Sequence, residues 1–225
     1  MKRIIKILLI FIFISGCVTT KFTSLEHFDK PTNYSRYWDN TVSSEYLDNY
    51  NNIWDNNGSF TLFADSLVAS RLITKESFHF TTPFEISCEA KWIPANLALI
   101  CPVWAFPLSD DKFDVKEFDL VEGSGRKVVM TCHIGENGYG THKVYPKYID
   151  ANPSEWNKYR MKVTEWNAKW WLNGKLVHKV NFCKDGIGKR DYYLRISIIM
   201  TTRLQDNSLP DTARMDIRNL KVKQF

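Results

Sequence analysis

The sequence predicts an all-β protein, folded as a sandwich or jelly roll of two antiparallel sheets. Short runs rich in β-branched and aromatic residues recur along residues 59–223, and Gly, Pro, Asn or Asp interrupts most of the junctions between them. Asn173-Gly174 joins two of these runs, and this dipeptide is a strong hairpin signal. No stretch shows the period of an amphipathic helix over a convincing length. Many short strands in about 200 residues are typical of a single sandwich domain.

The expected strands succeed one another closely along the chain. Residues 39–58 are interpreted as loops, with room for one short helix, and they end in a turn at Asn56-Asn57-Gly58. No repeat, low-complexity tract or internal linker divides the remainder of the chain. The expected strands are 59–64, 67–73, 78–80, 84–92, 97–106, 116–122, 127–133, 143–148, 158–166, 168–172, 175–182, 192–201 and 214–223.

One of these strands is acidic. Its residues read Glu-Phe-Asp-Leu-Val-Glu from Glu117 to Glu122, so Glu117 and Asp119 point to one face and the apolar residues beside them to the other. Regular alternation would turn Glu122 away, and a β-bulge at Leu120-Val121 would return it to the acidic face. Three carboxylates on one face raise one another's pKa values, which proteins tolerate mainly where the arrangement is used.

The spacing of these acids fits carbohydrate chemistry. With the bulge, side chains of Glu117 and Glu122 that lean together bring their carboxyls to about 5–6 Å, close to the roughly 5–5.5 Å of retaining glycosidases. The alternative is an edge strand whose acidic face is simply solvated, and the six residues alone do not decide between the two. On the next expected strand Thr131 and His133 share a face. Whether that face is the acidic one depends on a turn register that the sequence leaves open.

The beginning of the chain is typical of an export signal. Lys2, Arg3 and Lys6 precede an unbroken apolar run at 7–14 that is too short to span a bilayer comfortably. The following Ile-Ser-Gly-Cys sequence resembles the bacterial lipobox, which implies cleavage before Cys17 and a diacylglycerol on its sulfur. An ordinary signal peptide with a fortuitous cysteine is the alternative.

The resulting division of the chain is a lipoprotein signal at 1–16, a tether at 17–38 and one domain at 39–225. Lipid on Cys17 would anchor the protein to a membrane of the cell envelope without a transmembrane helix.

Composition narrows the range of partners. The formal net charge of +5 includes the three basic residues of the signal and is +2 without them, and no basic run or basic-aromatic interleaving indicates a nucleic-acid partner. Eight Trp, ten Tyr and fourteen Phe favour glycans, because sugar rings stack on aromatic faces, although sandwich cores also use aromatics.

Four cysteines remain in the expected domain: Cys88, Cys101, Cys132 and Cys183. Four cysteines allow three disulfide connectivities, and free buried thiols are the competing interpretation. Cys88 and Cys101 lie symmetrically about an expected turn at 93–96 and would face each other across a hairpin. The spacings do not resemble those of a zinc site.

The acidic strand and its flanking segments together resemble glycoside hydrolase family 16. The residues from Glu117 to Glu122 fit the bulged catalytic motif of that family, Glu-x-Asp-x-x-Glu, found in its laminarinase-, agarase-, porphyranase- and carrageenase-like members. The resemblance runs from about residue 58 to the end of the chain. It includes the paired strands at 70–75 and 84–91, a segment at 102–107 similar to Trp-Pro-Ala-Phe-Trp with its order disturbed, the Thr-x-His strand at 131–133, a hairpin within 156–178, and the last strands at 193–198 and 215–220.

This resemblance implies a concanavalin-like jelly roll with a glycan site on its concave face. It implies that Glu117 is the nucleophile, that Glu122 is the general acid/base, and that Asp119 lies between them. Asp119 would hold Glu117 by a shared hydrogen bond, and its charge would raise the pKa of Glu122, which must begin protonated. The implied reaction is double displacement with retention at the anomeric carbon. No cofactor is expected, and one carboxylate at Asp216, where some members bind structural calcium, does not make a metal site.

Two further residues are candidates for substrate binding. Trp104 is the best candidate for stacking on a sugar, with core packing as its alternative, and His133 is expected to line the site near the acids. Trp166, Trp170 and Trp171 lie in a hairpin that is interpreted as largely core.

Three functions remain open at this point. The first is a monomeric, retaining endo-β-glycanase acting on a β-1,3-glucan or a galactan. The second is a non-catalytic sugar-binding lipoprotein on the same sandwich, and the third is a transglycosylase. Three clustered carboxylates argue against a mere binder, which gains little from them.

Overall fold

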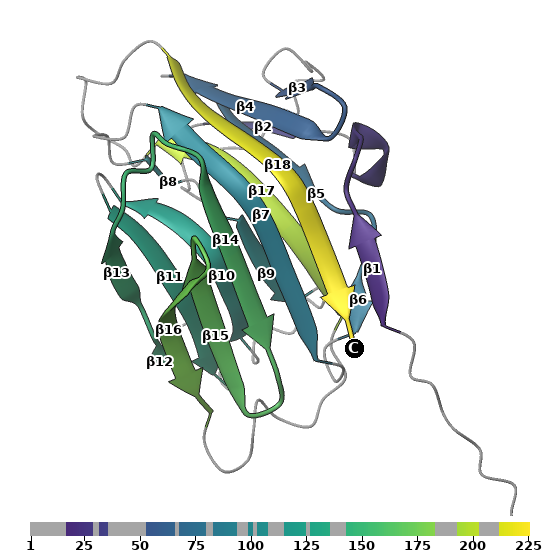
Figure 1. Cartoon of the computed structure of the whole chain (residues 1–225). Helices are drawn as coiled ribbons and strands as arrows, with labels where there is room; N and C mark the ends of the chain where they lie inside the picture. The colour runs from purple at the N-terminus through teal and green to yellow at the C-terminus, as the bar shows by residue number, and fades with distance from the viewer. Residues whose placement is uncertain are drawn as a thin grey trace, which may run out of the picture.

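Two antiparallel β-sheets packed face to face make up the structure, a computed structural model (Figure 1). It describes residues 17–28, 32–35, 53–65, 68–79, 83–93, 99–100, 103–107, 115–124, 127–135, 143–182, 193–202 and 212–225. Within these ranges the helical content is a single 3-10 turn, Leu25–His27, and no helix there is long and apolar enough to cross a membrane. The predicted all-β sandwich of two antiparallel sheets is confirmed.

The first sheet has eight strands and lies toward the viewer in Figure 1. Its strands pair in the order β16-β15-β14-β7-β18-β4-β3, and β1 pairs with β18 as an additional edge strand. Their bounds are β16 Lys175–Asn181, β15 Asn167–Leu172, β14 Asn157–Val163, β7 Phe84–Ile93, β18 Thr212–Gln224, β4 Ser59–Asp65, β3 Ile53–Asp55 and β1 Val18–Lys21.

The second sheet has ten strands and contains the acidic strand. Its main order is β12-β11-β10-β9-β17-β5-β2, with β13 paired to β11 and with β6 and β8 paired to β17. The bounds are β12 Lys143–Val144, β11 Lys127–Gly135, β10 Val115–Ser124, β9 Val103–Pro107, β17 Tyr193–Thr202, β5 Val68–Ile73, β2 Thr32–Ser35, β13 Lys147–Asp150, β6 Phe78–His79 and β8 Leu99–Ile100.

The hydrophobic core fills the space between the two sheets. Strand β7 shows the reason, because its side chains alternate strictly between buried and partly exposed positions, as a strand with one core-facing side requires. Fully buried aromatic residues enter the core from both sheets, with Trp92, Tyr159 and Trp170 from the first and Phe118 from the second. The outward faces of the two sheets therefore lie on opposite sides of the sandwich.

Two hairpins confirm the turn signals in the sequence. Asn57 and Gly58 have φ values of 53° and 86°, and Asn173 and Gly174 have 50° and 84°. Positive φ at both central residues defines a type I′ turn, whose twist matches the flanking strands and which favours Asn-Gly. The strand expected at 158–166 is shorter than predicted, because the hydroxyl of Thr164 accepts hydrogen bonds from two following backbone N–H groups and turns the chain.

The expected tether is wrong for residues 18–28. Strand β1 pairs with the last strand β18, and Phe22 and Phe28 are 1% and 2% exposed in the core. The sequence gives no sign that this segment belongs to the sheet, because polar residues surround the two phenylalanines and a four-residue edge strand is too short to show a period. Residues 18–28 are therefore part of the fold. The loops and short helix expected before residue 53 lie largely outside the described residues, and 53–55, also expected as loop, form β3.

The hairpin that would bring Cys88 to Cys101 does not form. Cys88 lies on β7 of the first sheet, whereas the strands on either side of Cys101, β8 and β9, belong to the second. Cys88 and Cys132 are free thiols buried in the core, and burial raises the pKa of both well above its usual range. Cys101 and Cys183 lie outside the described residues.

Candidate active site

The predicted bulge in β10 is present. Against β11, Asp119 lies opposite Thr131 and Glu122 lies opposite Val129, so two residues of β10 face one residue of β11. The register against β9 shifts at the same place, between Asp119 and Val121. The bulge returns Glu122 to the side of Asp119. The charge of Glu122 is one of the causes that raise the pKa of the Asp119 carboxyl. We call this outward side of the second sheet, with Glu117, Asp119 and Glu122, the acidic face.

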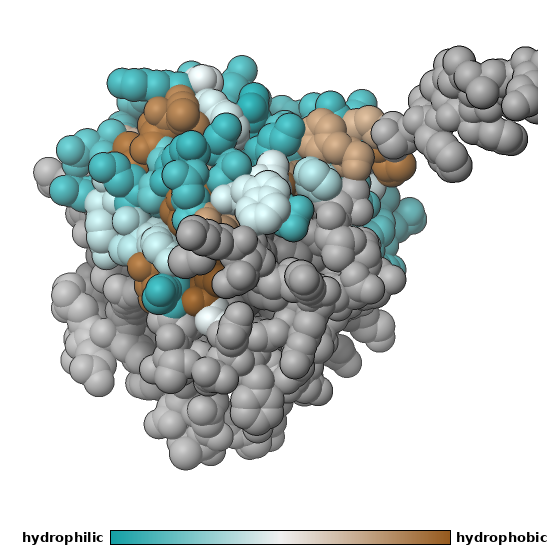
Figure 2. Space-filling view, turned by 90° about the horizontal axis from the view of Figure 1, so that it is seen from below, coloured by the Kyte–Doolittle hydropathy of each residue, from teal (hydrophilic) through white to brown (hydrophobic). Residues whose placement is uncertain are grey.

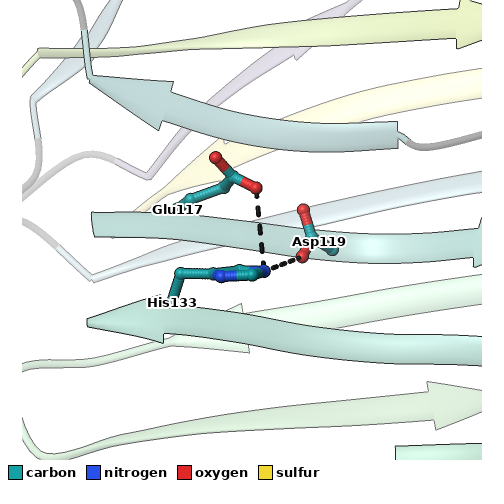
Figure 3. Close-up of side chains that lie close together, drawn as sticks. All are labelled: Glu117, Asp119 and His133. Atoms are coloured by element: carbon teal, nitrogen blue, oxygen red, sulfur yellow. Dashed lines mark ion pairs between the residues drawn. The ribbon is translucent and has the colours of Figure 1, made fainter. Parts of the chain in front are cut away.

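Strand β11 brings His133 to the acidic face, directly opposite Glu117 (Figure 3). The imidazole Nε2 lies 3.8 Å from Glu117 Oε1 and 3.4 Å from Asp119 Oδ2. The side chains of Glu117 and His133 are each 21% exposed, whereas that of Asp119 is 1% exposed. The turn register that the sequence left open is therefore the one that places His133 beside the acids.

Asp119 is the buried member of this group. Burial, followed by the charges of Glu122 and Glu117, raises the pKa of its carboxyl well above the usual range. Both of its carboxylate oxygens are buried without a hydrogen-bond partner in the described structure, as is the Thr131 hydroxyl opposite it. A proton on Asp119 converts a costly buried charge into a neutral donor between two glutamates.

The role that the family resemblance implies for Asp119 is to hold Glu117 by a shared hydrogen bond and to raise the pKa of Glu122 by its charge, and that role stays a prediction. The structure adds that burial is the first cause of the raised pKa of Asp119 itself.

A tryptophan of the opposite sheet holds the backbone at the bulge. Trp170, on β15, is fully buried and donates a hydrogen bond from its indole Nε1 to the backbone carbonyl of Asp119, 2.8 Å away. A bulge disrupts the ladder on the bulged strand, so this donor comes from outside the sheet. Trp170 was predicted to be core, which is correct, but no local pattern in the sequence indicated this contact.

Trp104 lies on the acidic face as well. It is opposite Asp119 on the neighbouring strand β9, and it is 9% exposed. Most of its surface is therefore packed, and only a margin of the indole is open to solvent beside the acids. Its position agrees with a place in the floor of a substrate site, and its contact with a sugar stays a prediction.

Tyr148 is a candidate that sequence reasoning missed. It lies on β13 opposite Val129, which itself lies opposite Glu122, so the row from Glu122 ends in a tyrosine that is 59% exposed. The expected strand at 143–148 is split into β12 and β13 at Tyr145 and Pro146. Only the pairing of β13 with β11, and of β11 with β10, shows that this exposed aromatic residue is aligned with the acids.

Two places invite comparison with metal sites. Ligand atoms of Glu117, Asp119 and His133 lie within 4.8 Å of one another, a spacing that could hold a metal ion. At Asp216, the Thr61 hydroxyl donates a 2.8 Å hydrogen bond, Arg214 pairs with both carboxylate oxygens, and Lys91 Nζ lies 3.4 Å away. Burial alone would raise the pKa of Asp216, but these contacts, above all with Arg214, lower it. Its charge is thus already balanced by two side-chain cations.

The chain matches no protein-family model, and no curated protein is similar to it in sequence. Its fold, however, is similar to that of many solved structures. A Bacteroides ovatus family 16 glycoside hydrolase of a mixed-linkage glucan utilisation locus, solved with a G4G4G3G product, gives a TM-score of 0.66 at 16% identity, covering 92% of this chain and 99% of that one. LamA of Z. galactanivorans, solved with laminaritriose and laminaritetraose, gives 0.65 at 15% identity with the same coverage.

A third similar structure comes from work on endo-acting O-glycanases of human gut bacteria that begin mucin breakdown. It gives a TM-score of 0.64 at 15% identity and covers 86% of this chain and 92% of that one. At these identities the similarity shows that the chain has the jelly-roll sandwich of the family 16 hydrolases.

Proposed function

We propose that this protein is a retaining endo-β-glycanase that hydrolyses internal β-glycosidic bonds of a polysaccharide. The observation that carries the proposal is the bulge of β10, which brings Glu122 to the same face as Glu117, with the buried Asp119 between them. The fold supports it, because solved structures with the same sandwich include endo-1,3-β-glucanases. Two carboxylates flanking a bond are the minimum that retaining hydrolysis requires.

In the proposed mechanism the carboxylate of Glu117 attacks the anomeric carbon while Glu122 donates its proton to the departing oxygen. Glu122 then removes a proton from water, and that water releases the sugar from Glu117 with retained configuration. Asp119 and His133 act on Glu117, since both lie next to its carboxylate and fix where it points. No cofactor takes part in these steps.

The sugar itself is proposed only as a class, a β-1,3-glucan or a galactan. The similar structures carry names that refer to laminarin-type, mixed-linkage and mucin glycans, so the sandwich accommodates different chains. Trp104 and Tyr148 are the aromatic residues placed to stack on sugar rings beside the acids, and His133 lines the same face.

We further propose that the protein is an exported, monomeric lipoprotein held in the cell envelope by lipid on Cys17. In the structure Cys17 is exposed and directly precedes β1, where a lipid chain meets no steric obstacle from the core.

The test is a panel of laminarin, lichenan, agarose, porphyran and carrageenan incubated with the protein, followed by sizing of the products. Rapid shortening of one polymer is expected, and the Glu117→Gln variant should release no reducing sugar. Glu122→Gln should lower the rate by about 10²- to 10⁴-fold, the usual contribution of a general acid.

Thermal unfolding of both variants must match the wild type, so that loss of activity is not loss of fold. Unchanged sugar release by Glu117→Gln would contradict the proposed mechanism, and no shortening of any polymer by the wild type would leave the non-catalytic sugar-binding alternative. Transfer of the cleaved chain to added oligosaccharides, instead of to water, would identify a transglycosylase.

A further inference from the structure

The outward face of the first sheet carries an aligned row of lysines. Lys223 on β18 and Lys162 on β14 both lie opposite Glu85 on β7. The row continues from Lys162 to Lys169 on β15 and from there to Lys179 on β16. Residues directly opposite each other on neighbouring strands point to the same face, so this row crosses five strands with one acid in it.

A parallel row of cations lies beside it. Lys21 on β1 is opposite Lys221 on β18, and Arg160 on β14 occupies the same row across β7. We call this outward side of the first sheet the basic face. Within the described residues its cations are Lys21, Lys91, Lys158, Arg160, Lys162, Lys169, Lys179, Arg214, Arg218, Lys221 and Lys223, and its acids, assigned by register, are Asp65, Glu85, Glu89 and Asp216.

The internal ion pairs of the basic face leave most of this charge unbalanced. Glu85 lies 3.6 Å from Arg160, Glu89 lies 2.8 Å from Arg218, and Asp216 pairs with Lys91 and Arg214. Lys162, Lys169 and Lys179 remain directly opposite one another, and like charges in such pairs are destabilising. Six strands at about 4.8 Å spacing make the array about 24 Å wide, which fits an extended anionic surface better than a small anion.

The basic face lies on the opposite side of the sandwich from the acidic face. Both sheets turn their apolar side chains to the shared core, so their polar faces point away from each other. Contact between the basic face and a flat surface would therefore leave Glu117, Asp119 and Glu122 open to a polymer on the other side.

The proposed lipid attachment site lies at a corner of the same face. Val18 pairs with Gln224, which places Cys17 beside the C-terminal Phe225. Val18 and Phe225 are 60% and 37% exposed, and the ammonium groups of Lys162 and Lys223 lie 4.2 and 4.7 Å from the centre of the Phe225 ring. Figure 2, seen from below, shows apolar residues gathered at the corner where the described chain begins, next to a largely hydrophilic margin.

We propose that the basic face binds the anionic headgroups of a phospholipid membrane and orients the acidic face away from it. The inference rests on the proposed lipidation of Cys17. A lipid anchor fixes one point and leaves the orientation of a domain free. Here β1 begins at Val18, one residue after the lipidated Cys17, so the domain lies directly against the bilayer. Each lysine near an anionic membrane surface then adds electrostatic attraction. The apolar corner at Val18 and Phe225 is then placed at the membrane interface.

The first experiment uses the chain from residue 17 with Cys17→Ser, which retains every other described residue and carries no lipid. Sedimentation with vesicles of phosphatidylcholine, with and without phosphatidylglycerol, measures binding. We expect binding only to the anionic vesicles, weakened by salt. The double variant Lys162→Gln/Lys169→Gln should bind about tenfold more weakly, whereas Lys143→Gln/Lys147→Gln, with the same change in net charge on β12 and β13, should bind like the parent chain.

The second experiment uses the lipidated protein on the same vesicles and an amine-reactive reagent. Lysines of the basic face should be protected on anionic vesicles and reactive on neutral ones, while Lys143 and Lys147 react on both. Equal labelling on both vesicles, or equal effects of the two double variants, would overturn the proposal. Binding to a soluble anionic polysaccharide but not to vesicles would do the same and would identify a polymer site.

Hydrolysis of a soluble polysaccharide separates this inference from the proposed function. The Lys162→Gln/Lys169→Gln variant should hydrolyse it at the parent rate, because both lysines lie on the outward face of the first sheet, on the opposite side of the sandwich from the acids. Vesicle binding without any hydrolysis would contradict the glycanase alone, and hydrolysis without vesicle binding would contradict only the orientation proposed here.

Discussion

At the scale of single residues, Asp119 is the most unusual group in the molecule. It is 1% exposed, it stands between two glutamates, and the imidazole Nε2 of His133 lies 3.4 Å from its Oδ2. Burial, followed by the charges of Glu122 and Glu117, disfavours the anion in this position and raises the pKa of Asp119.

Replacing Asp119 with Asn should make the protein more stable at neutral pH. Because the pKa of Asp119 is raised on folding, the folded chain holds this proton more tightly than the unfolded chain. Stability is therefore lost as pH rises above the unfolded value of about 3.9. The difference in unfolding free energy between Asp119→Asn and wild type should be small near pH 4. It should then grow by up to about 1.4 kcal/mol per pH unit until the raised pKa is passed.

Thermal unfolding between pH 4 and pH 8 measures this difference. Asp150→Asn is the matched control, since the side chain of Asp150 is 91% exposed and should show no such trend. A constant difference across the pH range would mean that Asp119 is ionised in the folded protein.

At the scale of elements, the bulge in β10 decides whether the site exists. If these residues formed a regular strand without the bulge, Glu122 would point into the core on the side of Phe118, and the acidic face would lose one member. The bulge interrupts the hydrogen-bonding register on both sides of the strand. The indole of Trp170 supplies a donor at this interruption from the opposite sheet. The two sheets are thus linked through a polar contact at the catalytic strand.

Replacing Trp170 with Phe should separate positioning from simple packing. The change leaves the Asp119 carbonyl buried without its indole donor, which costs about 1–3 kcal/mol. It should lower kcat more than it raises KM, because the flanking glutamates lose their fixed backbone. Trp92→Phe is the control, since Trp92 is also buried in the first sheet and stacks on Tyr159.

Denaturant unfolding and steady-state kinetics of the two variants provide the comparison. Similar losses of stability with kcat reduced only in Trp170→Phe are expected. If kcat falls equally in both, Trp170 acts only as a core residue.

At the scale of the whole molecule, the N-terminal and C-terminal segments complete one sheet. Strand β1 adds to β18, and Phe22 and Phe28 close the core beside it. This arrangement leaves no spacer between Cys17 and strand β1, so the proposed lipid on Cys17 would hold the domain directly against a membrane.

Phe22→Ala tests this role of the N-terminal segment. The change should destabilise the protein by about 3–5 kcal/mol, as for other buried phenylalanines. Val18→Ala, at a position 60% exposed, should change stability by less than about 0.5 kcal/mol. Urea unfolding followed by tryptophan fluorescence measures the free energy of unfolding of both variants. Equal, small effects would mean that this segment is a tether, as the sequence predicted.

Local patterns were sufficient for many of these features. Alternation within β10 and β11 predicts which side chains share a face, and the Asn-Gly signals predict one hairpin and one further turn at the correct residues. Predictions that required pairing between distant segments failed more often. The hairpin expected between Cys88 and Cys101 would join strands of different sheets, and strand β1 carries no period that distinguishes it from a tether.

By itself, the sequence determined the fold class, the acidic strand, its bulge and the three acids, because each depends on residues within reach of one another along the chain. Only the tertiary structure decided that His133 faces Glu117, that Trp170 reaches Asp119, and that scattered lysines form one basic face. Each of these depends on the register between strands that are far apart in sequence, and that register is set by how the two sheets bury their common core.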